Sequence, residues 1–310
     1  MLAALKRKLV WGWALILAVS LYALLAGGQW LEWGAYRFGE WLAPHRAPSA
    51  QVAMVSIDAA AQQKYGPWPW PRRFLAVLVD KLTDAKAQVI VLAEDFSAPQ
   101  NADALNYLSQ LKTLSANDPN AVALGLSAKL DEAQGVLAND NVLAASLLHS
   151  GRVLLAAPGY RTAAPAPATT GGDWSFALQP GVDTAPPVNL NPPLGLLTQA
   201  AHGVGYLDEN SAAPVEVPLL VQVNGQTVVS LPLLVAVRAQ GLENTSIHAG
   251  NFGGLSLGTT EIATDRHQQI LLHGGPVTLP NYGFADVVTG NVPAERFAGK
   301  VVLVGRCPQL

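Results

Sequence analysis

Five charged side chains lie next to two short apolar runs and are the first candidates for a binding site. They are Asp58, Arg72, Arg73, Glu94 and Asp95. Carboxylates can hold a cation or a basic group of a ligand, and guanidinium groups can pair with carboxylates. Two interpretations follow: a pocket for a ligand or cation, or a structural ion pair that fixes the loop between the two runs. Carboxylates alone are too weak a signal for catalysis.

The loop between the two apolar runs is rich in tryptophan and proline. Residues 65–73 have the sequence YGPWPWPRR, and three prolines in five residues exclude a regular helix or a central strand there. Trp68 and Trp70 form a candidate aromatic wall, which either stacks on a ligand or packs against the helix that follows. Packing is the simpler expectation, because tryptophan is highly buried on average.

Other chemical motifs are weak. Residues 254–258 fit the G-x-S-x-G pattern of serine hydrolases, but a nucleophile at Ser256 needs a strand–turn–helix context, and the residues that follow predict strands. No two of the six histidines have the spacing of a metal-ligand pair, there is one cysteine, and no phosphate-binding loop or dinucleotide fingerprint occurs. We therefore predict no cofactor, no metal site and no catalytic residue. A periplasmic serine hydrolase remains a remote alternative.

Two strands and a helix position the charged candidates. The runs 52–57 and 89–93 predict buried strands, and apolar residues at i, i+3, i+4 and i+7 from Leu75 predict a helix over 72–84. A strand–helix–strand unit joins parallel strands. The carboxyl ends of parallel strands meet at one edge of a sheet, where ligands of open α/β sheets bind. We therefore expect Asp58 and Glu94 at the carboxyl ends of parallel strands, where a ligand could bind, with Arg72 and Arg73 near enough to pair with the acids.

Strand and helix patterns continue along the chain. Further helices are expected around 105–111 and over 139–149, 194–201, 231–240 and 284–289. Further strands are expected over 121–126, 153–157 and 301–305, around Ser256 and Ile262, and over 270–272. Period-two alternation over 215–223, followed by Asn-Gly and 227–229, predicts a β-hairpin. A proline-rich segment, 158–193, predicts a long loop. The predicted fold class is α/β: a layered domain with a largely parallel central sheet plus a hairpin, preceded by one N-terminal transmembrane helix.

The transmembrane helix is predicted from an uncharged, mostly apolar run from Leu9 to Ala26. Its 18 residues reach the lower limit for crossing a bilayer, which is near ~17. Three basic residues, 6–8, precede the run, so the positive-inside rule places the N-terminus in the cytoplasm and the main domain outside. A cleaved signal peptide is the alternative, although its apolar core is usually shorter. The predicted partner of this run is the lipid bilayer.

Composition excludes several classes of protein. The 310 residues are 50% hydrophobic and only 13% charged, which excludes a disordered chain or a coiled coil. The formal net charge is −3, so a mildly acidic body does not attract nucleic acid. A single cysteine excludes a disulfide framework.

Several segments together resemble the CHASE-two family, the second class of cyclase- and histidine-kinase-associated extracellular sensor domains. The most specific segment is 66–72, GPWPWPR, which is similar to the family's tryptophan–proline signature. The other matching segments, in chain order, are SID at 56–58, DFSAP at 95–99, VPLL at 217–220, GGP at 274–276, YGFADV at 282–287 and FAGKVVLVG at 297–305. The resemblance covers about residues 52–305.

Three positions depart from the family pattern. Ala93 stands where the family typically has an aspartate, although Glu94 and Asp95 lie beside it. The segment 208–216 lacks the one or two arginines that usually precede the hairpin, which puts an acidic ligand of those arginines in doubt. Residues 305–307, Gly-Arg-Cys, replace the small residues that usually follow the last strand.

The resemblance implies a sensor of a small-molecule or envelope ligand. Similar proteins carry about three further membrane helices and a cytoplasmic output module, which is a cyclase, a diguanylate cyclase or phosphodiesterase, or a kinase. We therefore expect residues 1–28 to form a basic stub and membrane helix, 29–50 a juxtamembrane aromatic segment and 51–310 the extracytoplasmic sensor. This chain would then be the sensor half of such a receptor, located in the inner (cell) membrane, and a homodimer is plausible. The alternative is a periplasmic interaction domain without a small ligand.

Overall fold

The computed structural model describes residues 20, 50–116, 118–161, 175–176, 188–208, 216–223, 226–243, 246–249, 254–264, 267–272 and 279–306. The helices and strands named below belong to one compact unit, Pro48–Leu272 with Thr278–Leu310. The predicted membrane segment from Leu9 to Ala26 lies outside the described residues, except for Ser20, and so does nearly all of the segment 29–50. None of the helices among the described residues has the length and apolar character needed to cross a bilayer.

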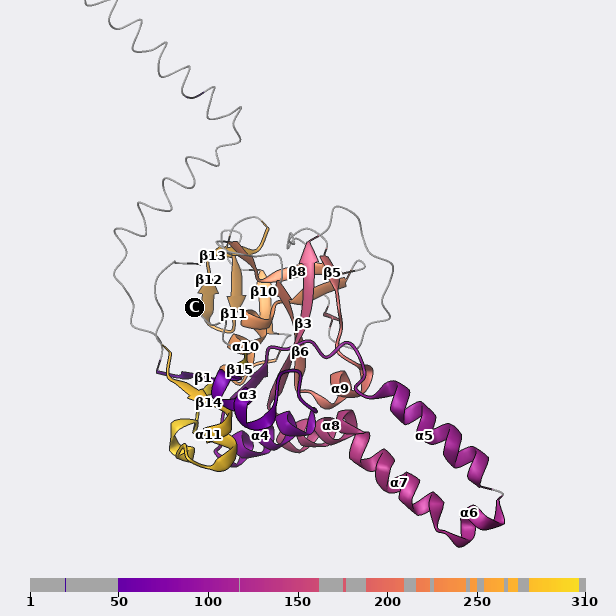
Figure 1. Cartoon of the computed structure of the whole chain (residues 1–310). Helices are drawn as coiled ribbons and strands as arrows, with labels where there is room; N and C mark the ends of the chain where they lie inside the picture. The colour runs from indigo at the N-terminus through magenta and orange to yellow at the C-terminus, as the bar shows by residue number, and fades with distance from the viewer. Residues whose placement is uncertain are drawn as a thin grey trace, which may run out of the picture. The chain divides into compact units, whose positions relative to one another are not determined.

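A parallel sheet forms the centre of this unit (Figure 1). Its parallel strands follow the order β14 (Asn281–Gly283), β1 (Val52–Ser56), β15 (Val301–Gly305), β2 (Val89–Leu92), β3 (Val153–Arg161) and β6 (Gly203–Asp208). An additional strand, β5 (Val188–Leu190), pairs antiparallel with the end of β3. The first and last apolar strands predicted from the sequence, β1 and β15, are direct neighbours, with Val52 opposite Val301. The largely parallel sheet is therefore confirmed.

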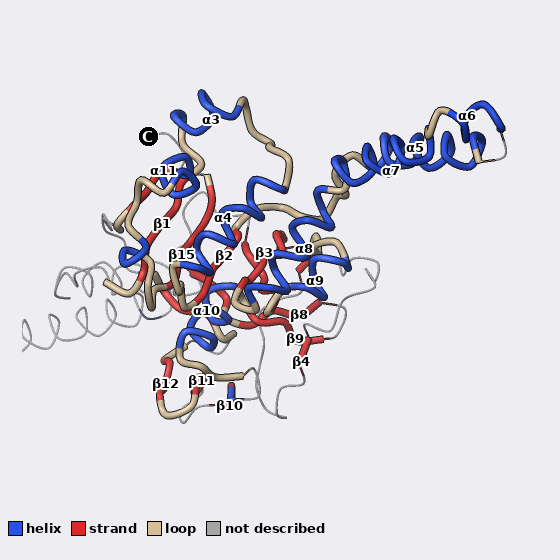
Figure 2. Tube along the Cα trace, turned by 90° about the horizontal axis from the view of Figure 1, so that it is seen from below, coloured by secondary structure: helices blue, strands red, loops and turns tan. Residues whose placement is uncertain are grey.

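Both faces of the sheet are covered, which explains why its strands are continuous apolar runs. In β2, Ile90 and Leu92 belong to one hydrophobic cluster, whereas Val89 and Val91 belong to another. The first cluster includes side chains of α4 (Arg73–Asp84), α8 (Asn139–Ser150) and α9 (Gly195–Ala200). The second includes side chains of α10 (Leu231–Ala239), which packs on the opposite face (Figure 2).

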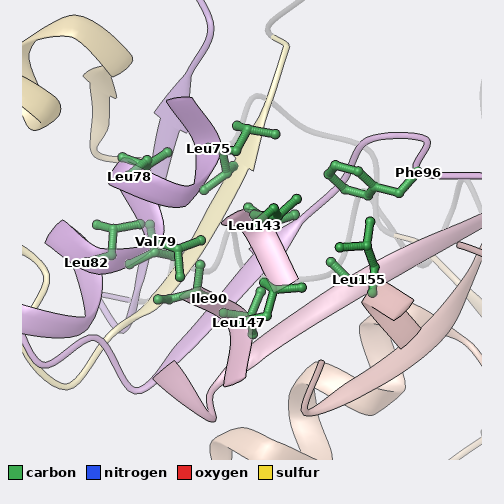
Figure 3. Packing of buried hydrophobic residues seen from close by; sticks show 14 of the residues in the cluster. Leu75, Leu78, Val79, Leu82, Ile90, Phe96, Leu143, Leu147 and Leu155 are labelled. Carbon is green, nitrogen blue, oxygen red and sulfur yellow. The ribbon is translucent and has the colours of Figure 1, made fainter. Parts of the chain in front are cut away.

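The helix predicted over 72–84 packs as its apolar spacing requires. Four α4 side chains are completely or almost completely buried: Leu75, Leu78, Val79 and Leu82. They lie in one cluster with Leu143 and Leu147 of α8 and with Ile90 and Leu155 of the sheet (Figure 3). Complete burial of such side chains contributes about 1.5–3 kcal/mol each, so this layer is the main source of stability near the candidate site.

Smaller elements surround the central layers. The predicted β-hairpin is present as β8 (Leu220–Val223) and β9 (Gln226–Val229), and β4 (Ser175–Phe176) pairs with β9. β7 (Glu216–Pro218) pairs with β13 (Gln269–Leu271), and β10 (Ile247–Ala249), β11 (Leu255–Leu257) and β12 (Thr260–Ile262) form an antiparallel sheet. Two short helices, α3 (Ala59–Tyr65) and α11 (Phe284–Thr289), and the 3-10 turn η3 (Ala294–Arg296) also belong to these smaller elements.

The strand predicted over 121–126 is wrong. This segment belongs to a helical hairpin formed by α5 (Ala102–Ser115), α6 (Pro119–Ala123) and α7 (Leu126–Leu137). Asp118 caps α6 by accepting a hydrogen bond of 2.8 Å from the Asn120 N–H, and Pro119 follows the cap, an arrangement that favours helix initiation. A short apolar run does not by itself distinguish a strand from a helix.

Other differences concern short strands. The segment 158–193, predicted as a loop, contains the end of β3 and the strands β4 and β5, while residues 162–174 and 177–187 lie outside the described ones. β6 and β14 were not predicted, because β6 is rich in glycine and β14 is only three residues long. The predicted alternation over 215–223 divides at Leu219 into two strands that pair with different partners.

Gly205 allows α10 to lie directly on β6. A Cβ atom at this position would lie 2.6 Å from Cα of Leu231, a main-chain atom that cannot move aside. We expect Gly205→Ala to lower the free energy of unfolding of the full chain by about 1–3 kcal/mol, measured by urea denaturation. Gly195→Ala, where a Cβ meets nothing within 4 Å, is the control and should not destabilise.

Candidate functional site

The carboxyl ends of the central parallel strands bring three of the charged candidates to one edge of the sheet. Asp58 lies two residues after β1, and Glu94 and Asp95 follow β2. Because β1, β15 and β2 are adjacent and parallel, these acids and Arg306, which follows β15, share that edge. Asp58 and Glu94 thus follow the carboxyl ends of two parallel strands, as expected, but β15 lies between those strands. Ligands of open α/β sheets bind at such edges.

Glu94 is the buried acid of this edge. Its carboxylate accepts a hydrogen bond of 3.2 Å from the main-chain N–H of Arg306 and lies 3.4 Å from Nε of the same residue. The Arg306 side chain is itself largely exposed. Burial raises the pKa of Glu94 above its ordinary value, and the neighbouring Arg306 only partly opposes this shift. A buried carboxylate held by one exposed cation is easily perturbed by a ligand.

The raised pKa of Glu94 predicts a pH-dependent stability. The folded state holds the proton of Glu94 more tightly than the unfolded state, so this group stabilises the fold fully only below pH 4.5. That contribution is lost as the pH rises through the folded-state pKa. Gln mimics the protonated form. We expect Glu94→Gln to raise the unfolding temperature at pH 8 by roughly 2–4 °C and to have the wild-type stability at pH 4, as measured by thermal melts of the full chain. A variant less stable than the wild type at pH 8 would contradict the prediction.

Asp58 caps the helix that follows its strand. Its Oδ1 accepts a hydrogen bond of 2.8 Å from the N–H of Ala61 at the start of α3. Oδ2 of Asp58 and Oδ2 of Asp286 lie 2.9 Å and 3.4 Å from the position that a Cβ of Gly283 would occupy, so both carboxylates border the same stretch of main chain. In the described part of the chain, no group of three or more potential metal-ligand side chains could hold an ion. This corner therefore carries two carboxylates, those of Asp58 and Asp286.

The two arginines do not pair with the acids expected for them. The buried Arg72 donates to Oδ1 of Asp140 at 2.6 Å and to the Ala98 carbonyl oxygen at 2.7 Å, and its guanidinium lies over the ring of Phe96. The predicted pairing with the three acids is wrong for Arg72, because the packing of α8 against α4 brings Asp140 to its guanidinium, and the loop after β2 presents the Ala98 carbonyl oxygen to it. Arg73 is exposed and lies over the ring of Phe74.

Asp95 also acts within its own loop. Its Oδ1 accepts a hydrogen bond of 2.8 Å from the N–H of Ser97, which orients the chain after β2. The five candidates therefore have five different sets of partners and are not joined to one another by a described hydrogen bond or ion pair. No local sequence pattern indicates the partners of Arg72 and Glu94, because Asp140 lies 68 residues from Arg72 and Arg306 lies 212 residues from Glu94.

The two tryptophans have different environments. Trp70 is buried, its Nε1–H donates to the Gly66 carbonyl oxygen at 2.7 Å, and its ring packs 4.8 Å from that of Phe284. Trp68 is half-buried and meets Trp70 edge-on. The peptide bond from Trp68 to Pro69 is cis. The packing interpretation therefore holds for Trp70, while Trp68 is the part of the aromatic wall that a ligand can still reach.

The Ser256 motif lacks the geometry of a hydrolase. Ser256 is the central residue of β11, paired on one side with His248 and on the other with Glu261. A nucleophile elbow is a sharp turn between a strand and a helix, and a relay places the histidine between the serine and the acid. The order is different in this sheet, because Ser256 lies between His248 and Glu261. The expectation that strands surround this motif is confirmed, and no acyl-transfer site follows from it.

The geometry describes a layered α/β domain with a charged carboxyl edge and no assembled catalytic constellation among the described residues. A family model for the CHASE2 domain matches residues 14–308. The chain therefore belongs to the CHASE2 domain family, a family of extracellular sensor domains of signalling receptors that are sensory rather than catalytic. No curated protein and no solved structure gives a significant match to it.

Proposed function

We propose that this chain is the membrane-anchored sensing part of a transmembrane receptor. The helix from Leu9 to Ala26 crosses the inner (cell) membrane with the N-terminus in the cytoplasm, and residues 51–310 receive a small-molecule or envelope ligand outside. The signal passes to a cytoplasmic cyclase, diguanylate cyclase or phosphodiesterase, or kinase. The family match supports the sensory role, and the basic residues before the apolar run support the orientation.

The contact between Glu94 and Arg306 is the observation that carries the proposal. Arg306 directly follows β15, so it lies where the chain leaves the central sheet. A ligand that binds Glu94 or Arg306 at the carboxyl edge competes with their mutual contact and changes how Arg306 is held. Such a ligand shifts the equilibrium between a held and a released Arg306 by no more than its difference in affinity for the two states.

Two measurements on the full chain test this proposal. Alkaline phosphatase fused after residue 306 should be active in cells, because the sensor is exported, whereas a green fluorescent protein at the same position should stay dark. Thermal-shift screening of the detergent-solubilised chain against amino acids, organic acids and phosphorylated metabolites should then find a stabilising compound, since selective binding to the folded state raises its stability. Glu94→Ala should abolish that shift, and Asp103→Ala, an exposed acid on α5, should retain it. A dark phosphatase fusion, or a shift unaffected by Glu94→Ala, would refute the proposal.

An interaction domain without a small ligand is the second candidate. The exposed apolar side chains of the helical hairpin favour it. A screen that yields no stabilising compound, together with an exported sensor, would favour this second function.

A further inference from the structure

The helical hairpin of α5, α6 and α7 is a feature that the sensor role does not explain. Both views show it projecting away from the central sheet (Figures 1 and 2). No residue of α5, all of whose side chains are described, is buried, and Leu130 is the one buried residue of α7. Helices of 14 and 12 residues are marginal in water without tertiary packing. The hairpin is thus incompletely packed within one copy of the chain.

α5 carries two apolar stripes, and α7 covers one of them. Leu105 and Leu108 are half-buried on the side that packs against α7. Tyr107, Leu111 and Leu114, at i, i+4 and i+7, share the other side and are 68%, 52% and 77% exposed. We call these three residues the outer stripe. At the turn of the hairpin, Val122 and Leu124 are also 66% and 77% exposed.

The residues at the two ends of the hairpin, before α5 and after α7, are joined by hydrogen bonds and an ion pair. These contacts fix the direction in which the outer stripe faces. Arg72 joins the chain before α5, through the Ala98 carbonyl, to Asp140 in α8, the helix that follows α7. The Gln100 N–H donates to Oδ2 of Asp140 at 2.9 Å, and the Asn101 side chain donates to the Leu137 carbonyl oxygen at 3.1 Å. Both ends of the hairpin are therefore tied to each other and to α4.

We propose that the outer stripe of α5 is the contact surface for a second copy of this chain, with the two hairpins packed about a two-fold axis. In such a contact the same patch of each copy faces the other, so a patch with a strong net charge would repel its own copy. The outer stripe avoids this problem. The charged residues of α5 are Asp103, near its start, and Lys112, which pairs with Asp131 of α7 inside the hairpin.

The exposed area suits a dimer. The outer stripe and the two apolar residues at the turn leave on the order of 600 Å² of surface open, against the ~800 Å² per partner of a standard stable interface. Packing two helical hairpins together gives the four-helix arrangement that buries such stripes. The outer stripe carries no charge. It therefore suits an equally uncharged stripe on a second copy of the chain better than an acidic or basic surface on another protein.

Site-specific cross-linking of the full chain tests the contact. We replace Cys307 with serine and introduce Leu111→Cys on the outer stripe or, as the matched control, Ser109→Cys, which is exposed on the opposite side of α5. A short bismaleimide applied to native membranes should give at least ten-fold more cross-linked dimer with Leu111→Cys than with Ser109→Cys. Equal yields from both positions would overturn the proposal, because any contact through the membrane anchor is the same in both variants.

A charge introduced into the outer stripe provides an independent test. Leu114→Glu in both copies should weaken dimerisation of the detergent-solubilised chain at least ten-fold in analytical ultracentrifugation. Leu148→Glu, on the 66% exposed Leu148 of α8, should leave dimerisation unchanged. Circular dichroism spectra of both variants at 20 °C should match the wild type, which excludes misfolding as the cause. A monomeric wild type, an undiminished Leu114→Glu dimer, or Leu114→Glu losing only binding of the chain to lipid vesicles would each contradict a two-fold contact.

Discussion

Replacing Arg72 with alanine should lower the unfolding temperature of the full chain by roughly 10 °C, since breaking a buried ion pair costs about 3–5 kcal/mol. The guanidinium uses one nitrogen for Asp140 and another for the Ala98 carbonyl oxygen, and it covers the ring of Phe96. Alanine leaves the largely buried Asp140 carboxylate without its cation and the carbonyl oxygen without its donor. Circular dichroism melts of the detergent-solubilised chain measure the effect.

Arg73→Ala is the matched control for Arg72→Ala. Arg73 is the next residue along the chain, is exposed, and has a contact only with the ring of Phe74 among the interactions described for it. Its replacement should change the unfolding temperature by no more than about 2 °C. Arg72→Lys should lie between the two, because a lysine ammonium cannot reproduce the planar fork that reaches two acceptors. Equal effects of Arg72→Ala and Arg73→Ala would show that the ion pair with Asp140 does not stabilise the fold.

The central layers were predictable because local patterns determine them. The apolar spacing from Leu75 to Leu82 matched α4, and the runs at β1, β2 and β15 matched parallel strands, since both periodicities follow from backbone geometry. The helix predicted over 231–240 is likewise present as α10, and its start has a local cause, since Ser230 caps it and Pro232 lies in its first turn. In each case the side chains that decide the structure lie within a few residues of one another.

The helical hairpin shows where local patterns fail. Leu105, Leu108 and Leu111 correctly indicated a helix, yet Leu111 lies on the exposed outer stripe rather than with the half-buried pair. The run 121–126 contains the turn from α6 into α7, and its apolar residues Val122 and Leu124 are exposed instead of buried in a sheet. The prediction assumed that apolar side chains are buried. Leu111, Val122 and Leu124 are apolar but exposed in a single copy of the chain.

The position of the candidate site in the fold was predictable from the sequence, but the contacts between its residues were not. Parallel strands require that the residues after β1 and β2 share an edge, which located Asp58 and Glu94. The partner of Glu94 depends on β15 lying between β1 and β2, and no local pattern reports strand order. The same limit applies to Arg72, whose partner Asp140 is brought close only when α8 packs against α4.

Trp70→Ala should lower the free energy of unfolding of the full chain by about 3–5 kcal/mol, the usual cost of removing a buried aromatic side chain. Trp70 contacts the rings of Tyr65, Trp68, Phe74 and Phe284, and thereby joins α3, α4 and α11 beside the carboxyl edge. Alanine would leave a cavity among these rings and remove the donor to the Gly66 carbonyl oxygen. Urea denaturation followed by circular dichroism measures the loss.

Two further variants separate packing from ligand binding at this loop. Trp70→Phe keeps most of the buried ring but loses the Nε1–H donor, so its cost should be smaller, about 1–2 kcal/mol. Trp68→Ala should cost less than Trp70→Ala, because Trp68 is half-buried. If Trp70→Ala were as stable as the wild type and lost only the thermal shift caused by a bound compound, Trp70 would be a ligand contact and the packing interpretation would be wrong. If Trp70→Ala destabilises the unliganded chain as expected, the tryptophan–proline loop is held in place by its own aromatic core before any ligand binds.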